Sequence, residues 1–156
     1  IAMRLVRMAL DFSMHHNQPA ILVLDAFFSV ESVFTLAGSL WSLALKEPFV
    51  QIIVKAKKSY VAYQEAIQPE KRGPGRPLKY GAPVKLWEVF EQSQADFQQA
   101  TCSIYGRTET ISYLALNLLW KPTGSLIRFV FSKTSRGLMI LMCRDLTMDP
   151  VRAISL

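Results

Sequence analysis

Two short apolar runs with a helical segment between them decide the fold of this sequence. The first is Ala20-Ile21-Leu22-Val23-Leu24, which ends at Asp25, and the second is Phe49-Val50-Gln51-Ile52-Ile53-Val54. Continuous apolar runs of this length are typical of strands that are covered on both faces of a parallel sheet. Residues 29–45 have the composition of a helix, with Ser29 as its N-cap. This order predicts a right-handed βαβ unit in an α/β fold.

Helices are also expected near both ends of the chain. Residues 1–15 place Leu5, Met8 and Phe12 at helical spacing, which predicts one buried apolar face. Near the other end, Asp149 and Pro150 are the typical N-cap and first residue of a helix. Because the sequence begins and stops inside helices, we expect it to be a fragment of a longer protein.

The second half of the chain has the pattern of an antiparallel β meander. Turn residues at 106–107, 122–124 and 135–137 separate apolar segments. The expected strands are 101–105, 110–119, 126–132 and 138–143. Between Pro69 and Pro83, four prolines and three glycines predict an exposed loop, followed by a short helix at 84–92. The predicted fold class is therefore α/β in the broad α+β sense, with a meander attached to the βαβ unit.

Composition limits the class of protein. The chain has 156 residues, of which 51% are hydrophobic and 19% charged, which suits one packed domain and excludes wholesale disorder. Polar residues such as Lys46 and Glu47 interrupt the most apolar region, so no membrane span is expected. Cys102 and Cys143 share no metal-ligand spacing and suit a reducing cytosol.

The positive charge of the chain is concentrated in one stretch. The formal net charge is +6, and residues 55–85 carry all of it. A basic stretch beside a neutral body is expected of a protein that binds DNA phosphates, although an ordinary solvated loop has the same composition. Within it, the Gly-Arg-Pro core of residues 71–79 suits either a narrow minor groove or a flexible connector.

Asp25 is the most informative acidic residue. It follows a buried strand at the carboxyl edge of the predicted sheet, where α/β proteins place their ligands. Its carboxylate is either a ligand of Mg²⁺ or an acceptor for the backbone N–H groups that follow. Asp149 is explained as a helix cap, and Asp145 lies at the exit from the last strand. Packing in the core is the role expected of Trp41, and it is favoured over stacking on a base for Trp87 and Trp120.

The order of these features resembles the DDE transposases of bacterial insertion sequences that carry a β-strand insertion in a ribonuclease H-like core. Asp25 matches the position of the family's second catalytic aspartate, and the basic residues after the strand at 49–54 match the family's basic strand end. The resemblance implies that residues 1–65 are part of the catalytic core, that residues 66–143 are a basic loop and β-rich insertion, and that residues 144–156 begin the helix that returns to the core.

The resemblance also implies an activity, namely metal-dependent DNA cleavage and strand transfer with Asp25 as a ligand of Mg²⁺ or Mn²⁺. The implied partner is double-stranded DNA, both at the transposon ends and at the target site. The implied location is the bacterial cytoplasm, at the nucleoid, with no membrane involved. A homodimer of the full-length protein is also possible. The expected DNA-binding residues are Lys55, Lys57, Lys58, Arg72, Arg76, Lys79 and Lys85.

Two acidic residues of the family's active site have no counterpart in this chain. They are an earlier aspartate and a later glutamate, whose helix is expected to begin just past Leu156, so the fragment alone should be catalytically inactive. The chief alternative is a non-catalytic DNA-binding module built on the Gly-Arg-Pro segment. A third hypothesis is a degenerate remnant without activity.

Overall fold

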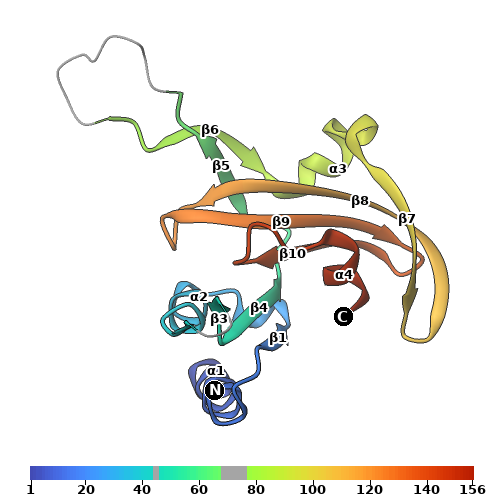
Figure 1. The fold of residues 1–156 in the computed structure, drawn as a ribbon. Helices are drawn as coiled ribbons and strands as arrows, with labels where there is room; N and C mark the ends of the chain where they lie inside the picture. The colour runs from blue at the N-terminus through green and yellow to red at the C-terminus, as the bar shows by residue number, and fades with distance from the viewer. Residues whose placement is uncertain (44–45, 68–76) are drawn as a thin grey trace.

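One large sheet forms the centre of the molecule (Figure 1). The computed structural model of the chain describes residues 1–43, 46–67 and 77–156, and in these the sheet has eight strands in the order β1-β4-β10-β9-β8-β5-β6, with β7 paired to β8. Their bounds are β1 Ala20–Leu24, β4 Val50–Lys55, β5 Val61–Glu65, β6 Tyr80–Lys85, β7 Gln98–Ile104, β8 Arg107–Trp120, β9 Ser125–Thr134 and β10 Gly137–Cys143. The fold is mixed α/β with a mostly antiparallel sheet.

The predicted parallel pair of strands is present at one edge of this sheet. β1 and β4 pair in parallel, from Ala20 opposite Val50 to Leu24 opposite Val54. β1 is not covered on both faces as expected, because Val23 is 49% exposed. An edge strand has only one neighbouring strand, and here the helices cover only one of its faces.

The helix between these strands is shorter than predicted. A 3₁₀ turn, η1 (Ala26–Phe28), precedes α2 (Glu31–Ala37), whose N-cap is Val30. The prediction of Ser29 as N-cap is wrong: its hydroxyl donates to the carbonyl of Ala26 at 2.6 Å. The helix ends at Gly38, where a Cβ would overlap the guanidinium of Arg144.

The segment after α2 forms a small hairpin instead of the last turns of a helix. β2 (Trp41–Ser42) pairs with β3 (Glu47–Pro48) in a separate two-stranded sheet. As a result Trp41 is 59% exposed, and its expected place in the core is wrong.

The four predicted strands of the meander are confirmed as β7 to β10, and the turns fall at the expected residues. Tyr105 and Gly106 both have positive φ, of 49° and 76°, as the two central residues of a tight hairpin turn often do. β10 continues the sheet directly into the parallel pair, because Met142 lies opposite Val54 in antiparallel register. The meander and the βαβ unit therefore share one hydrogen-bonded sheet.

Strands β5 and β6 form a hairpin at the opposite edge of the sheet. β5 was not predicted, and residues 80–83 were expected to be loop. Pro83 lies opposite Tyr63 within β6. Proline is tolerated in an edge strand because the position without an N–H group can face solvent instead of the neighbouring strand. The rest of this region forms η2 (Leu86–Glu88), α3 (Val89–Gln92) and η3 (Gln94–Asp96).

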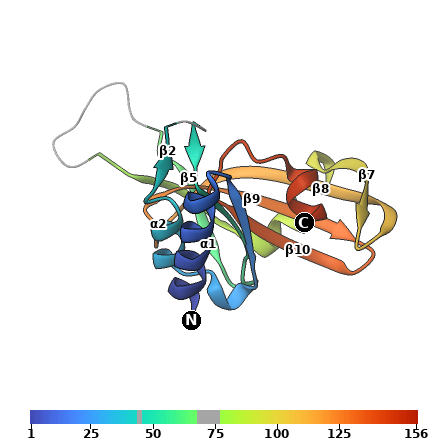
Figure 2. The same cartoon turned by 60° about the horizontal axis from the view of Figure 1, so that its bottom comes forward.

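Helix α1 (Ala2–His16) lies beside α2 against one face of the parallel pair (Figures 1 and 2). Its helical nature was predicted, but the expected buried face of Leu5, Met8 and Phe12 is wrong, since all three are exposed. The buried residues are instead Val6, Leu10 and Ser13. The Ser13 hydroxyl contacts the Phe49 carbonyl at 2.7 Å, which ties the end of α1 to the start of β4.

Side chains alternate between the two faces of the sheet and build a core on each. The face covered by α1, α2 and α3 holds Ile52, Val54, Phe129, Phe131, Ile140 and Met142. The other face is covered by α4 (Pro150–Ser155) and holds Ile53, Val130, Leu141 and Cys143. The period of two residues along a strand produces this division.

An aromatic contact joins the βαβ unit to the far half of the sheet. Trp120, at the end of β8, is buried as expected and packs against Phe34 of α2 and Tyr60, with ring centroids 5.4 and 5.6 Å away. The Tyr60 hydroxyl lies 2.9 Å from that of Ser29 and 2.8 Å from the Ser29 carbonyl. The segment that connects β4 to β5 is thereby attached to the residues that follow Asp25.

The predicted cap of α4 is confirmed, and it gives a direct test of the fold. The Asp149 carboxylate accepts hydrogen bonds from the N–H groups of Val151 and Arg152 at 3.3 and 3.2 Å. We expect Asp149→Ala to lower the free energy of unfolding in urea by about 1 kcal/mol with an unchanged m-value, and Asp149→Asn to have little effect. Asp11→Ala, at an exposed position of α1, is the control. Equal losses in both alanine variants would contradict the cap.

Candidate functional site

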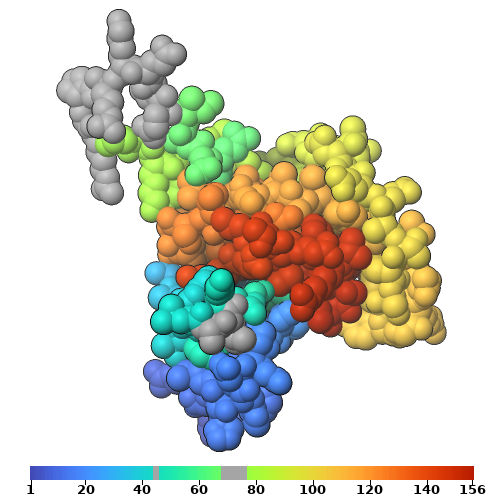
Figure 3. Space-filling model, viewed as in Figure 1, coloured from blue at the N-terminus to red at the C-terminus, as the bar shows by residue number. Residues whose placement is uncertain are grey.

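A pocket of about 430 Å³ lies beside Asp25, on the α4 face of the sheet. The ends of β1 and β4, the β7–β8 and β9–β10 turns and helix α4 form its walls. Figure 3 shows α4 (dark red) between the N-terminal part of the chain (blue) and the β7–β8 hairpin (yellow). Within the part of the chain that the structure describes, the charged residues lining this pocket are Asp25, Lys55 and Arg136.

Strand register explains why Asp25 and Lys55 line the same pocket. Leu24 lies opposite Val54 in the parallel pair, and each is followed directly by one of the two charged residues. Leu24 and Val54 belong to the core beneath α1 and α2. Because side chains alternate, the next residue of each strand points to the opposite face, which is the face of α4. Lys55 is also paired with Leu141 of β10, another residue that lines the pocket.

The carboxylate of Asp25 is not used as a helix cap. Asp25 stands at the N-cap position of η1, but its side chain accepts no hydrogen bond from the N–H groups of that turn. Its backbone carbonyl accepts a hydrogen bond from the N–H of Phe28 at 2.9 Å. The side chain is exposed, so of the two predicted roles of Asp25 the cap has no contact to support it.

Asp25, the acidic residue among those lining this pocket, can fill one ligand position of a magnesium ion. Over residues 1–43, 46–67 and 77–156, no group of three or more His, Cys, Asp or Glu side chains is arranged to hold a metal. Mg²⁺ binds through one or two carboxylates together with water and substrate phosphates. Asp25 can supply one such carboxylate, while Lys55 and Arg136 add positive charge to the same pocket.

The other two aspartates considered from the sequence lie outside this pocket. Asp145 accepts hydrogen bonds from the N–H and the hydroxyl of Thr147, at 2.8 and 2.7 Å. Asp149 caps α4. Both carboxylates thus stabilise the chain between β10 and α4, and the structure brings neither of them together with Asp25.

The predicted DNA-binding lysines are spread over several places. Lys55 lines the Asp25 pocket. Lys57 and Lys58 follow β4, and the Lys58 ammonium lies 4.4 Å from the ring centroid of Trp87. Trp87 is only partly buried, and this lysine covers one face of its ring. Lys79 precedes β6, with its ammonium 5.6 Å from the ring centroid of Tyr80.

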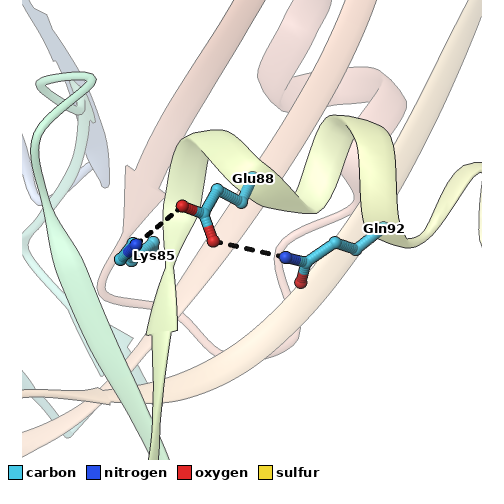
Figure 4. Close-up of polar contacts among 3 residues, drawn as sticks. All are labelled: Lys85, Glu88 and Gln92. Atoms are coloured by element: carbon cyan, nitrogen blue, oxygen red, sulfur yellow. Dashed lines mark hydrogen bonds and ion pairs between the residues drawn. The ribbon is translucent and has the colours of Figure 1, made fainter.

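Lys85 differs from the other lysines because it has an acidic partner. Its ammonium lies 2.8 Å from Glu88, whose other carboxylate oxygen accepts a hydrogen bond from Gln92 at 3.2 Å (Figure 4). The hydrogen bond and charge of Glu88 raise the pKa of Lys85. A paired lysine has less to gain from a phosphate than an unpaired one. Arg72 and Arg76 lie outside the described residues, as does the Gly-Arg-Pro segment as far as residue 76.

Arg136 is a candidate site residue that was not predicted. It lies in the β9–β10 turn, and its guanidinium packs 4.1 Å from the ring centroid of Tyr105, which also lines the pocket. The Ser135 N–H donates a hydrogen bond to the carboxylate of Glu109 at 3.0 Å. The side chain of Ser135, this backbone bond and the charge of Arg136 together lower the pKa of Glu109. The turn was recognisable in the sequence, but its position beside Asp25 depends on the pairing of four strands.

Comparisons with known proteins leave the site to be interpreted on its geometry. Neither the protein-family models, nor the curated proteins, nor the solved structures include a match to this chain. Among the helices of the described residues, none combines the length and the apolar character needed to cross a membrane.

The two cysteines give a test of the packing behind the site. Cys143 belongs to the core on the α4 face, and burial raises the pKa of its thiol to about 12. Cys102 is partly exposed on β7. Because the thiolate is the reactive form, we expect iodoacetamide at pH 8 to modify Cys102 at least about tenfold faster than Cys143 in the folded chain. Peptide mapping by mass spectrometry measures both rates, and unfolding in urea should equalise them. Similar rates in the folded chain would contradict the burial of Cys143.

Proposed function

We propose that this chain is the central part of a DDE transposase with a ribonuclease H-like core, in which Asp25 is one of three carboxylates that bind Mg²⁺ or Mn²⁺. The observation that carries the proposal is that the carboxylate of Asp25, which caps no N–H group of η1, lines a pocket that α4 also lines. In the family that the sequence resembles, the helix after the β insertion returns to the catalytic core, which contains the second aspartate. The place of α4 beside Asp25 is consistent with that arrangement.

The charges of the pocket support a phosphodiester as substrate. Lys55 and Arg136 come from two different elements and line the same space as Asp25. Two cations around one carboxylate favour a ligand that carries negative charge, and a DNA phosphate has that charge. In this proposal Asp25 binds the metal, and the two basic side chains bind and orient the DNA strand.

The metal would supply the chemistry that these side chains lack. A divalent ion activates water or a 3′-hydroxyl and stabilises the leaving oxygen of an in-line displacement. One carboxylate does not hold two such ions against their hydration, so we expect no cleavage by this chain alone. The other two acidic residues of the proposed site would lie outside this chain.

The proposed partner is double-stranded DNA. Lys57, Lys58 and Lys79 belong to the basic stretch at 55–85 and have no acidic partner among the described residues. Their contribution would be to phosphate binding, with Lys85 a weaker contributor because of Glu88. The roles of Arg72 and Arg76, a homodimer of the full-length protein and a location at the bacterial nucleoid remain predictions.

Replacing Asp25 tests the proposed catalytic role. In a protein that contains this chain together with the other two acids, we expect Asp25→Asn to slow Mg²⁺-dependent strand cleavage by roughly three orders of magnitude, because several kcal/mol of transition-state stabilisation depends on the metal. DNA affinity measured without metal should change little. Cleavage of a labelled duplex and its binding by fluorescence anisotropy measure the two effects.

Asp145→Asn is the matched control, because Asp145 is a half-buried residue whose carboxylate accepts hydrogen bonds from Thr147 and does not line the Asp25 pocket. It should leave cleavage near its original rate. If Asp25→Asn cleaves as fast as the unchanged protein, the transposase proposal fails and the non-catalytic DNA-binding module becomes the better hypothesis.

A further inference from the structure

We infer that Tyr63, Tyr80, Lys79 and Lys121 form a second DNA-binding surface, which contacts the phosphate backbone of a duplex. This tyrosine–lysine corner lies at the β5–β6 edge of the sheet, opposite the edge that carries Asp25. The inference rests on the DNA partner of the proposed function, but it is independent of any catalytic role of Asp25. Lys121 lies outside the basic stretch at 55–85 and only the fold brings it to this corner.

Three segments of the chain meet at the corner. Tyr63 of β5 and Tyr80 of β6 contact each other edge to face, with ring centroids 5.4 Å apart. Lys121, in the β8–β9 turn, places its ammonium 4.2 Å from the ring centroid of Tyr63 and 5.6 Å from that of Tyr80. Lys79 contacts Tyr80 at 5.6 Å. Two cations are therefore held over one pair of aromatic rings.

The β8–β9 turn is shaped so that Lys79 can approach it. Gly124 closes this turn with φ of 62°, and its N–H donates to the Trp120 carbonyl at 2.9 Å. A Cβ at Gly124 would lie 2.9 Å from the Lys79 ammonium. Lys79 thus approaches the turn to which Lys121 belongs.

The lysines of the corner are positioned without being neutralised. Among the described residues, the structure has one ion pair, between Lys85 and Glu88. The aromatic faces attract Lys79 and Lys121 and limit their freedom, but a ring carries no net charge. A phosphate that binds between them therefore meets fixed, unpaired cations, so less ordering of side chains is needed on binding.

The tyrosines add hydrogen-bond donors to these cations. Phenolic hydroxyls donate to phosphate oxygens in many protein–DNA complexes. Within the described part of the chain, no hydrogen bond is found for the hydroxyl of Tyr63 or Tyr80, whereas the Tyr113 hydroxyl donates a hydrogen bond to Gln98 at 2.9 Å. Cations that neutralise phosphates, together with hydroxyl donors, favour the DNA backbone over an uncharged ligand.

One acidic residue lies close to the corner and gives a test of opposite sign. Glu65 is opposite Tyr80 in the β5–β6 hairpin, beyond a register shift that follows Tyr63. Its carboxylate repels phosphate. If DNA lies over this corner, removal of the Glu65 charge should strengthen binding.

The experiment measures binding of the 156-residue chain to a fluorescent DNA duplex by anisotropy over a series of KCl concentrations. Lys121→Gln and Lys79→Gln should each reduce the slope of log affinity against log salt by about 0.9, since each removes one phosphate contact. The double change Tyr63→Phe with Tyr80→Phe should weaken binding at an unchanged slope. Glu65→Gln should tighten it.

Lys133→Gln is the matched control. Lys133 also holds its ammonium over a ring, 4.3 Å from the centroid of Phe97, but at a different part of the sheet. Its replacement should leave the slope unchanged, and thermal unfolding by circular dichroism should show that every variant is folded.

Several results would overturn the inference. They are an absence of DNA binding by the chain, equal changes of slope in the Lys121 and Lys133 variants, and competition by polyglutamate as effective as that by unlabelled duplex. Failure of the transposase proposal would give a different result. Strand cleavage would then not depend on Asp25, whereas the Lys121→Gln change would still reduce the salt slope.

Discussion

The parallel pairing of β1 with β4 fixes the position of the charged groups around Asp25. With Leu24 opposite Val54, the two chains leave the sheet side by side, and alternation of side chains directs Asp25 and Lys55 to the same face. β10 then pairs with β4 and brings α4 and the Arg136 turn to that face. A shift of one residue in this register would direct one of the two charged side chains into the core beneath the helices. The apolar residues that precede Asp25 and Lys55 therefore determine the chemistry of the pocket.

The two candidate surfaces lie at opposite edges of one sheet and are connected through a buried aromatic cluster. Tyr60 packs on Trp120 and is hydrogen-bonded to Ser29, four residues after Asp25. Trp120 is followed directly by Lys121. A rigid path of packed residues thus runs from the Asp25 pocket to the tyrosine–lysine corner. A duplex bound at the corner would be held at a fixed position relative to the pocket, which is a requirement for selecting one phosphodiester bond for cleavage.

Local signals in the sequence were sufficient for some elements and insufficient for others. The Asp149 cap and the strand at 20–24 were predictable because their determinants are adjacent in the chain. The buried face of α1 was not, because this helix carries two apolar stripes at helical spacing. One contains Leu5 and Met8 and the other Val6 and Leu10, and only packing against the sheet chooses between them.

Long-range pairing explains what sequence patterns missed at the candidate sites. β5 is only five residues long and β6 contains Gly81 and Pro83, and they form strands because β5 pairs with the end of β8. For the same reason neither Arg136 nor Lys121 could be assigned to a site from spacing alone. Asp25 was found because the end of a buried strand is itself a local feature.

The proline in β6 makes the two edges of the sheet unequal. Pro83 removes a backbone donor from one outer strand, so an approaching strand from another molecule finds an incomplete ladder there. β1 contains no proline, and in the described residues its outer side has no strand partner. Edge-to-edge association between copies should therefore be less favourable along β6 than along β1.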